Sequence, residues 1–127
     1  MPDTNPFFSK DGLQNLQDMG EIDFQQNILD IFFKTARDYL QKTLTAIQEK
    51  NFSAVHFSAH SLKGAALGVG AGYISRKIHL VEKESEAEEN LDRVKGLIKY
   101  LNHWEPIIRN TDPSKYTDFI EEIDYGK

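Results

Sequence analysis

The sequence predicts an all-α fold: an up-and-down antiparallel four-helix bundle with a short extra helix at its N-terminus and a tail or short helix at its C-terminus. Apolar residues recur at steps of three and four along four long segments of the 127-residue chain. No stretch alternates apolar and polar residues between turn signals, so we expect almost no sheet. The connections between the four segments are short, which favours antiparallel neighbours.

The first two helices are marked by capping residues and by helical spacing. Ser9 can cap a short helix that continues toward Asp18 and ends at Gly20. A long amphipathic helix then extends from about Asp23 to Glu49. Its apolar positions are Phe24, Ile28, Ile31, Phe32, Ala36, Leu40, Leu44 and Ile47.

The remaining helices follow in the same way. Asn51 can cap the third helix, whose narrow apolar stripe consists of Phe52, Val55, Ala59, Leu62, Ala66 and Val69. The fourth helix has Ile74, Ile78 and Val81 on one face and ends in a polar run, residues 82–90. The fifth helix uses Leu91, Val94, Ile98 and Leu101 and reaches Trp104 before Pro106 kinks or stops it. A last short helix or docked tail contains Tyr116, Phe119, Ile120 and Ile123. We expect four aromatic residues to lie in the core: Phe24, Phe32, Phe52 and Trp104.

Length and composition indicate one domain, residues 1–127, with a bundle core over about 13–105 and a peripheral segment 106–127. The absence of cysteine excludes disulfides, thiolate zinc sites and a cysteine nucleophile. The net charge is −5, without the basic stripe that binding to nucleic acid requires. No window has the roughly 18 apolar residues of a membrane span. We therefore expect a cytoplasmic monomer that binds neither nucleic acid nor membrane.

The residues that indicate chemistry lie on the third helix. At about 100° per residue, His60 lies on the flank of the core stripe and faces solvent. Lys63 is its neighbour at i+3, where an ammonium would stabilise a phosphoryl group bound to the imidazole. Gly64 lies one turn beyond His60 and costs about 1 kcal/mol relative to Ala in a helix, which folding alone does not require. A glycine at this position lets another surface approach the imidazole closely.

A metal site is the weaker interpretation of the same region. His56 and His60 are four residues apart, a spacing that can place two imidazoles on one metal ion, and Glu82 could supply a third ligand. Two histidines without a second signal are weak evidence, and a bound metal would occupy the lone pair that a nucleophile needs. We therefore expect no metal site, and we expect His79 and His103 to be surface residues.

The pattern His60, Lys63, Gly64 and Gly70 resembles that of the histidine-containing phosphotransfer (HPt) domains of multistep two-component signalling. The resemblance extends from about Leu13 to about Leu101. It includes the apolar segment 28–33, the sequence Lys50-Asn51-Phe52 before the histidine helix, and Val81-Glu82 at the family's carboxylate or amide position. Two departures are Ala65, where many members have Ser, and Gly68. The family's fold is a four-helix bundle.

The resemblance implies that His60 is phosphorylated by the aspartyl phosphate of one receiver domain and passes the phosphoryl group to an aspartate of another. Lys63 would then support the phosphoryl group, Gly64 would clear space for the receiver, Glu82 would hold the other ring nitrogen, and Gly70 would be structural. The partners would be response-regulator receiver domains and a hybrid sensor histidine kinase. An apolar rim for partner binding would comprise Leu13, Leu16, Met19, Ile28 and Leu67.

Neither a nucleotide-binding loop nor a glycine box occurs in the sequence, so we expect a phosphotransfer protein without autokinase activity. We expect it to bind no cofactor of its own, with Mg²⁺ held by the partner receiver domain. An alternative from a different class keeps the bundle but makes it a non-catalytic docking or inhibitory module that binds a kinase or receiver. That alternative leaves Lys63 and Gly64 unexplained.

Overall fold

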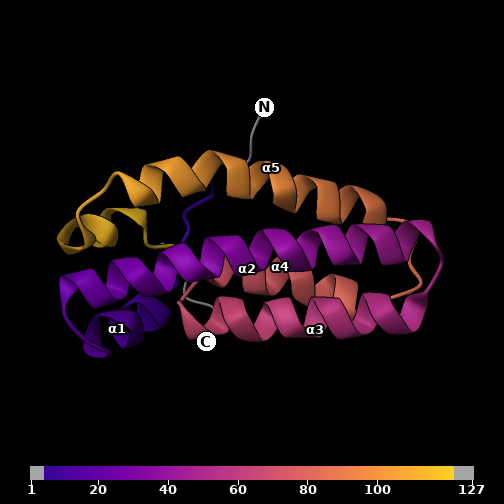
Figure 1. Ribbon diagram of the computed structural model, residues 1–127, viewed down its shortest axis with the longest axis horizontal. Coiled ribbons are helices and arrows are strands. Elements are labelled where there is room, and N and C mark those ends of the chain that lie inside the picture. The colour runs from indigo at the N-terminus through magenta and orange to yellow at the C-terminus, as the bar shows by residue number, and fades with distance from the viewer. Residues whose placement is uncertain (1–4, 122–127) are drawn as a thin grey trace.

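The computed structural model describes residues 5–121 and confirms the all-α bundle. Four long helices form it: α2 (Ile22–Gln48), α3 (Phe52–Gly68), α4 (Gly72–Lys83) and α5 (Asn90–Arg109). The short helix α1 (Lys10–Asp18) lies against one end of α2 and α3, and a 3-10 helix, η1 (Pro113–Phe119), follows α5 near the same end (Figure 1). No helix of the described chain is long and apolar enough to cross a membrane.

The expected caps form as hydrogen bonds. The Ser9 hydroxyl accepts from the Gly12 N–H at 3.2 Å at the start of α1, and the Asn51 side chain accepts from the Ala54 N–H at 3.2 Å at the start of α3. Lys50 adopts a positive φ of 56° in the tight turn between α2 and α3. This turn sets α3 antiparallel to α2, and the histidine helix packs against α2 and α4.

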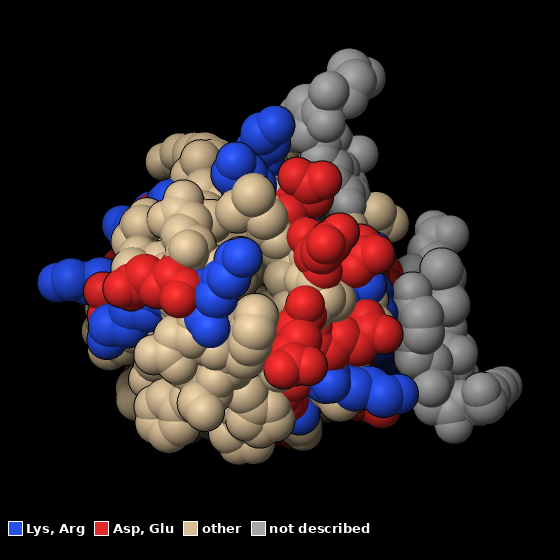
Figure 2. Space-filling model, turned by 90° about the vertical axis from the view of Figure 1, so that its right-hand side faces the viewer, with Lys and Arg blue, Asp and Glu red and all other residues tan. Residues whose placement is uncertain are grey.

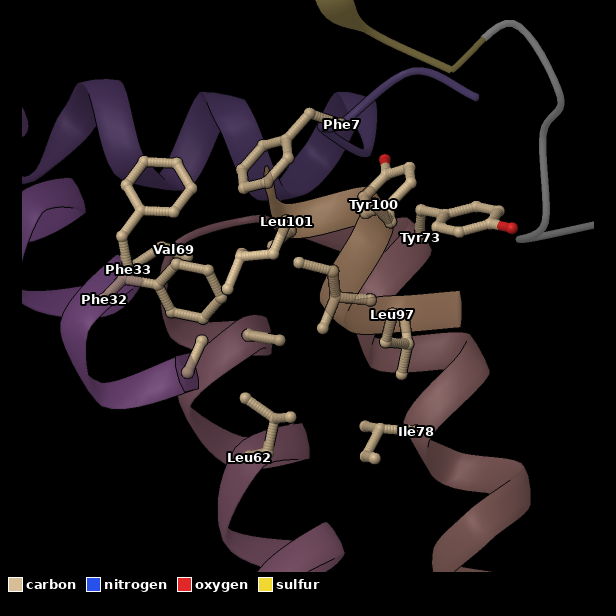
Figure 3. Close-up of a cluster of buried hydrophobic side chains, with 14 of the residues drawn as sticks. Phe7, Phe32, Phe33, Leu62, Val69, Tyr73, Ile78, Leu97, Tyr100 and Leu101 are labelled. Atoms are coloured by element: carbon tan, nitrogen blue, oxygen red, sulfur yellow. The ribbon is translucent and has the colours of Figure 1, made fainter. Parts of the chain in front are cut away.

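The core is a continuous cluster of buried aliphatic and aromatic side chains (Figure 3). Phe32 and Trp104 belong to it as expected. The prediction was wrong for Phe24 and Phe52, whose residues are 48% and 36% exposed, and Ile31 also faces solvent. At the start of α2 the inward position is taken by Gln25, which is buried and donates to the Gly20 carbonyl at 3.0 Å.

The structure packs the C-terminal segment against the bundle more closely than the sequence indicated. Helix α5 continues through Pro106 to Arg109, because Trp104 and Ile108 on either side of the proline are both buried. Tyr116 of η1 is buried as well and contacts the ring of Phe8. The expected position Ile123 lies outside the described residues.

The N-terminal segment crosses the same end of the bundle and joins the C-terminal segment. The Phe8 N–H donates to the Phe119 carbonyl at 3.0 Å, and the Glu121 N–H donates to the Phe8 carbonyl at 2.8 Å. Within residues 5–121 this contact is an isolated bridge between Phe8 and Ile120, in agreement with the expected lack of sheet.

The opposite end of the bundle, where α2 meets α3 and α4 meets α5, is strongly acidic on one side (Figure 2). The α4–α5 connection at this end carries exposed glutamates at positions 84, 86, 88 and 89. Glu84 pairs with Arg93 at 2.9 Å.

Candidate functional site

His60 lies on the outer surface of α3, and its side chain is 65% exposed. Helices α3 and α4 lie side by side, and α4 presents Glu82 to the imidazole. The distance between His60 Nδ1 and Glu82 Oε2 is 2.7 Å. Glu82 itself is only 7% exposed, so a buried carboxylate holds the exposed imidazole. The core residues Ile78 and Val81 of α4 pack inward and position Glu82 at this height.

Lys63 reaches the same carboxylate. Its Nζ lies 2.6 Å from Glu82 Oε1 and 3.3 Å from Oε2. One buried carboxylate therefore joins an exposed imidazole and a partly buried ammonium. The i, i+3 relation between His60 and Lys63 places both side chains on the α4 side of α3, which is why one acceptor can serve them.

The electrostatics of this cluster keep Glu82 ionised. Burial by itself raises the pKa of the carboxyl group, but hydrogen bonds from Lys63 and His60, together with their charges, outweigh burial and lower the pKa from 4.5 to about 2. Glu82 is therefore a permanent hydrogen-bond acceptor near neutral pH. The Nδ1–H of a neutral His60 ring donates to it.

We expect Glu82→Gln to destabilise the fold near neutral pH and to reduce its sensitivity to acid. Since the fold lowers the pKa of Glu82, the carboxylate contributes its full stabilisation above about pH 4.5 and loses it as the pH falls toward about 2. Urea unfolding of wild type and variant at about pH 7 and about pH 2.5 measures this. The difference between the two proteins should shrink at the lower pH, and a constant difference would contradict the assignment.

The hydrogen bond at Nδ1 decides what the other ring nitrogen can do. A neutral imidazole has one N–H and one lone pair, and Glu82 holds the N–H at Nδ1. The lone pair of His60 is then on Nε2, at the solvent side of an exposed ring. This arrangement presents a nucleophile whose orientation is fixed by its partner.

Two further histidines lie beside Glu82. The sequence grouped His56 with His60 and Glu82 only as a possible set of metal ligands, and it did not place His79 there. His56 Nδ1 lies 3.0 Å from the Glu82 backbone carbonyl, and its ring is stacked parallel to that of His60 at 6.4 Å. His79 Nδ1 lies 3.5 Å from Lys63 Nζ and 3.7 Å from Glu82 Oε1. The i, i+3 spacing of His79 and Glu82 on one helix was the available signal. Among residues 5–121, no group of three or more ionisable side chains is arranged to hold a metal ion.

The other candidate residues are placed apart from this cluster. His103 packs edge-on against Trp104 on α5. The Ser61 hydroxyl donates to the Phe57 carbonyl at 3.0 Å and does not reach His60. Neither residue adds a chemical group to the site.

The two motif glycines differ in their surroundings. A Cβ added at Gly64 would meet nothing within 4 Å, so the fold itself does not require a glycine there. Gly70 has a φ of +75°, and a Cβ there would overlap the backbone of Gly12 and Leu13. Gly70 therefore allows α1 to approach the α3–α4 turn, whereas Gly64 leaves open space beside His60.

The expected apolar rim is only partly present at the surface. Leu13 and Leu16 are fully buried, which corrects their assignment as partner-binding residues, because α1 packs its apolar face against α2 and α3. Met19 is half exposed, Leu67 is 62% exposed and Ile28 is partly buried. Other large apolar side chains exposed on α2 and α3 are Ile22, Phe24, Ile31, Phe52 and Phe57.

A family model for the Hpt domain matches residues 27–104, from the first turns of α2 to the last turns of α5. The chain belongs to the Hpt domain family, as the motif on α3 indicated. Members of this family transfer phosphoryl groups through a histidine in two-component phosphorelays and interact with receiver domains and kinases. The matched region contains His60, Lys63, Gly64 and Glu82. Searches of curated proteins and of solved structures found no match.

Proposed function

We propose that His60 accepts a phosphoryl group from the aspartyl phosphate of one receiver domain and transfers it to the aspartate of another. The observation that carries this proposal is the hydrogen bond of 2.7 Å between Nδ1 and the buried Glu82 carboxylate, which leaves the exposed Nε2 as the nucleophile. The family match supports phosphotransfer in general, and the exposure of the ring supports the choice of Nε2.

In the proposed step, the Nε2 lone pair forms the N–P bond while the P–O bond to the receiver's aspartate breaks. The aspartate leaves as a carboxylate, and the ring gains one positive charge because Nδ1 keeps its proton. Glu82 offsets that charge at 2.7 Å, and transfer to a second receiver is the reverse of the same step. No proton has to leave the site, which suits a reversible reaction.

Lys63 supplies the cation for the transferred group. Lys63 Nζ and the His60 ring contact the same Glu82 carboxylate. A small rotation of the flexible lysine side chain would therefore bring Nζ to a phosphoryl group on Nε2. The proposal assigns Mg²⁺ to the receiver domain and no cofactor to this chain. We place the protein in the cytoplasm, where its receiver partners would be found.

The surface that receives the partner is proposed to lie around Gly64 and to include Met19, Ile28 and Leu67. A small apolar centre with a polar surround suits a transient interface. Met19→Lys should therefore weaken receiver binding and leave the fold within about 0.5 kcal/mol of wild type, because the side chain is half exposed.

Leu16→Lys is the matched change at a buried position of the same helix. It should destabilise the protein by more than about 3 kcal/mol, since it buries an unpaired charge. Urea unfolding and receiver titration of both variants separate the two effects. Unchanged receiver affinity in Met19→Lys would remove α1 from the proposed interface.

The experiment that tests the proposed function is incubation of the protein with a receiver domain carrying a labelled aspartyl phosphate, in the presence of Mg²⁺. Label should appear on this chain and should be acid-labile and alkali-stable, as expected of an N–P bond that breaks when its nitrogen is protonated. ATP alone should give no label. Absence of transfer from any receiver, with binding retained, would favour the non-catalytic docking module.

A further inference from the structure

His79 contacts the candidate site but has no part in the transfer step described above. Its ring extends from α4 one turn before Glu82, and its side chain is about half exposed. Nδ1 is 3.5 Å from Lys63 Nζ and 3.7 Å from Glu82 Oε1. His79 therefore lies beside the same ammonium and the same carboxylate oxygen that form the ion pair of the site.

Lys63 has two competing partners in the proposed function. Without a phosphoryl group, its ammonium is paired with Glu82 Oε1 at 2.6 Å. A phosphoryl group on His60 would attract the same ammonium. If Lys63 moved there, Oε1 of a largely buried carboxylate would lose its ion-pair partner, and only the charged His60 ring at Oε2 would remain to offset the carboxylate. Removing one partner of a buried ion pair is destabilising. A replacement cation at Oε1 would remove this cost.

We propose that His79 is a positioning residue whose protonated ring replaces Lys63 at Glu82 Oε1 and so frees the ammonium for the phosphoryl group on His60. This inference rests on the proposed function. A neutral ring with its lone pair on Nδ1 can accept a hydrogen bond from Lys63. After protonation, Nδ1 donates, repels the ammonium and needs only a small movement from 3.7 Å to bind Oε1. The proton comes from water, and no bond to phosphorus changes in this exchange.

The exchange depends on pH, because histidine is the side chain that changes charge between about pH 5 and 8. The charged groups that contact His79 are Lys63 of α3 and Glu82 of α4. Arg76 and Lys83 lie three and four residues away on α4, and His60 of α3 binds the other oxygen of Glu82. Arg76, one turn before His79, binds both oxygens of Glu121 at 2.7 Å. Helix α5 meets α4 on another flank, where Tyr73 stacks on Tyr100 at 4.4 Å.

The exchange can be observed without phosphotransfer. The NMR chemical shifts of the Lys63 Cε and Nζ atoms should move in wild type as the pH falls from about 8.5 to about 6, because Lys63 leaves Glu82 as His79 becomes charged. In His79→Gln the same atoms should change much less over this range, since the ring that could replace Lys63 at Oε1 is absent. Identical titration of Lys63 in the two proteins would overturn the proposal, whatever the outcome of the labelling experiment.

The consequence for transfer is measured as the equilibrium constant for phosphoryl exchange between this protein and one receiver domain, the same preparation in every assay. His79→Gln should lower the phosphorylated fraction by about two- to fivefold at about pH 6 and leave it unchanged at about pH 8.5, as expected of a partly exposed ion pair. His79→Lys, with a permanent cation, should restore the wild-type value at the lower pH and exceed it at the higher one.

A double-mutant cycle shows whether His79 acts through Lys63. In a Lys63→Gln background, His79→Gln should have no further effect on the equilibrium constant for phosphoryl transfer between this protein and the receiver domain. A different result would be that His79→Gln lowers the phosphorylated fraction by the same factor with and without Lys63, or by the same factor at both pH values. Either result would indicate a general structural role and overturn the proposal. Failure of His60 to take up label would instead reject the proposed function, and the NMR titration would still decide the exchange between Lys63 and His79.

Discussion

His60→Gln is expected to abolish labelling of the protein by a phosphorylated receiver domain, down to the background of the assay. The glutamine side chain can still donate an amide N–H to Glu82, but it has no ring nitrogen with a free lone pair. Because the His60 side chain is 65% exposed and glutamine can keep the hydrogen bond to Glu82, the free energy of unfolding should change by less than about 1 kcal/mol. Scintillation counting after gel separation, with circular dichroism of the same samples, measures both quantities.

The matched control is His103→Gln. His103 lies on α5 and contacts Trp104, away from Glu82, so this variant should take up label as wild type does. Receiver binding should persist in His60→Gln, since the partner surface is intact. Label that survives in His60→Gln would place the phosphoryl group on another residue. Full biological activity of an unlabelled His60→Gln protein would support the docking module.

The fold could be predicted from the sequence because the features that define its helices lie within a few residues of one another. Helical spacing and two caps, at Ser9 and Asn51, define where the helices begin, and these caps are present as hydrogen bonds. The errors concern which face of a helix is buried at its ends. Phe24 fits the apolar periodicity of α2, yet the neighbouring Gln25 is buried because its amide reaches the Gly20 carbonyl. Such a contact between a side chain and a loop leaves no periodic signal.

The candidate site could be predicted only as far as one helix and a family pattern allow. His60, Lys63 and Gly64 are visible because they share consecutive turns of α3. The contact of His79 with Lys63 depends on how far α4 is shifted along its axis relative to α3. The spacing of residues within one helix does not determine that shift. The burial of Leu13 and Leu16 likewise depends on the close approach of α1, which Gly70 permits by adopting a positive φ.

Gly64→Gln is expected to lower the rate of transfer about 100-fold without destabilising the protein. A Cβ at this position meets nothing within 4 Å, so the fold accepts the new side chain. Replacing a helical glycine should raise the free energy of unfolding by up to about 1 kcal/mol. The added side chain nevertheless extends into the space one turn from His60 that the receiver must occupy. A displacement of about 1 Å between the reacting atoms is enough for a loss of this size.

Gly96→Gln isolates the helix effect from the steric one. Gly96 is also a helical glycine with open space around its Cα, but it lies on α5, away from His60. Both variants should gain similar stability in urea unfolding, and only Gly64→Gln should lose transfer in a rapid-quench assay. Because the two substitutions share the same change in helix propensity, a difference in transfer rate between them reports access to His60. Equal rates in both variants would show that the receiver approaches His60 from a side that Gly64 does not border.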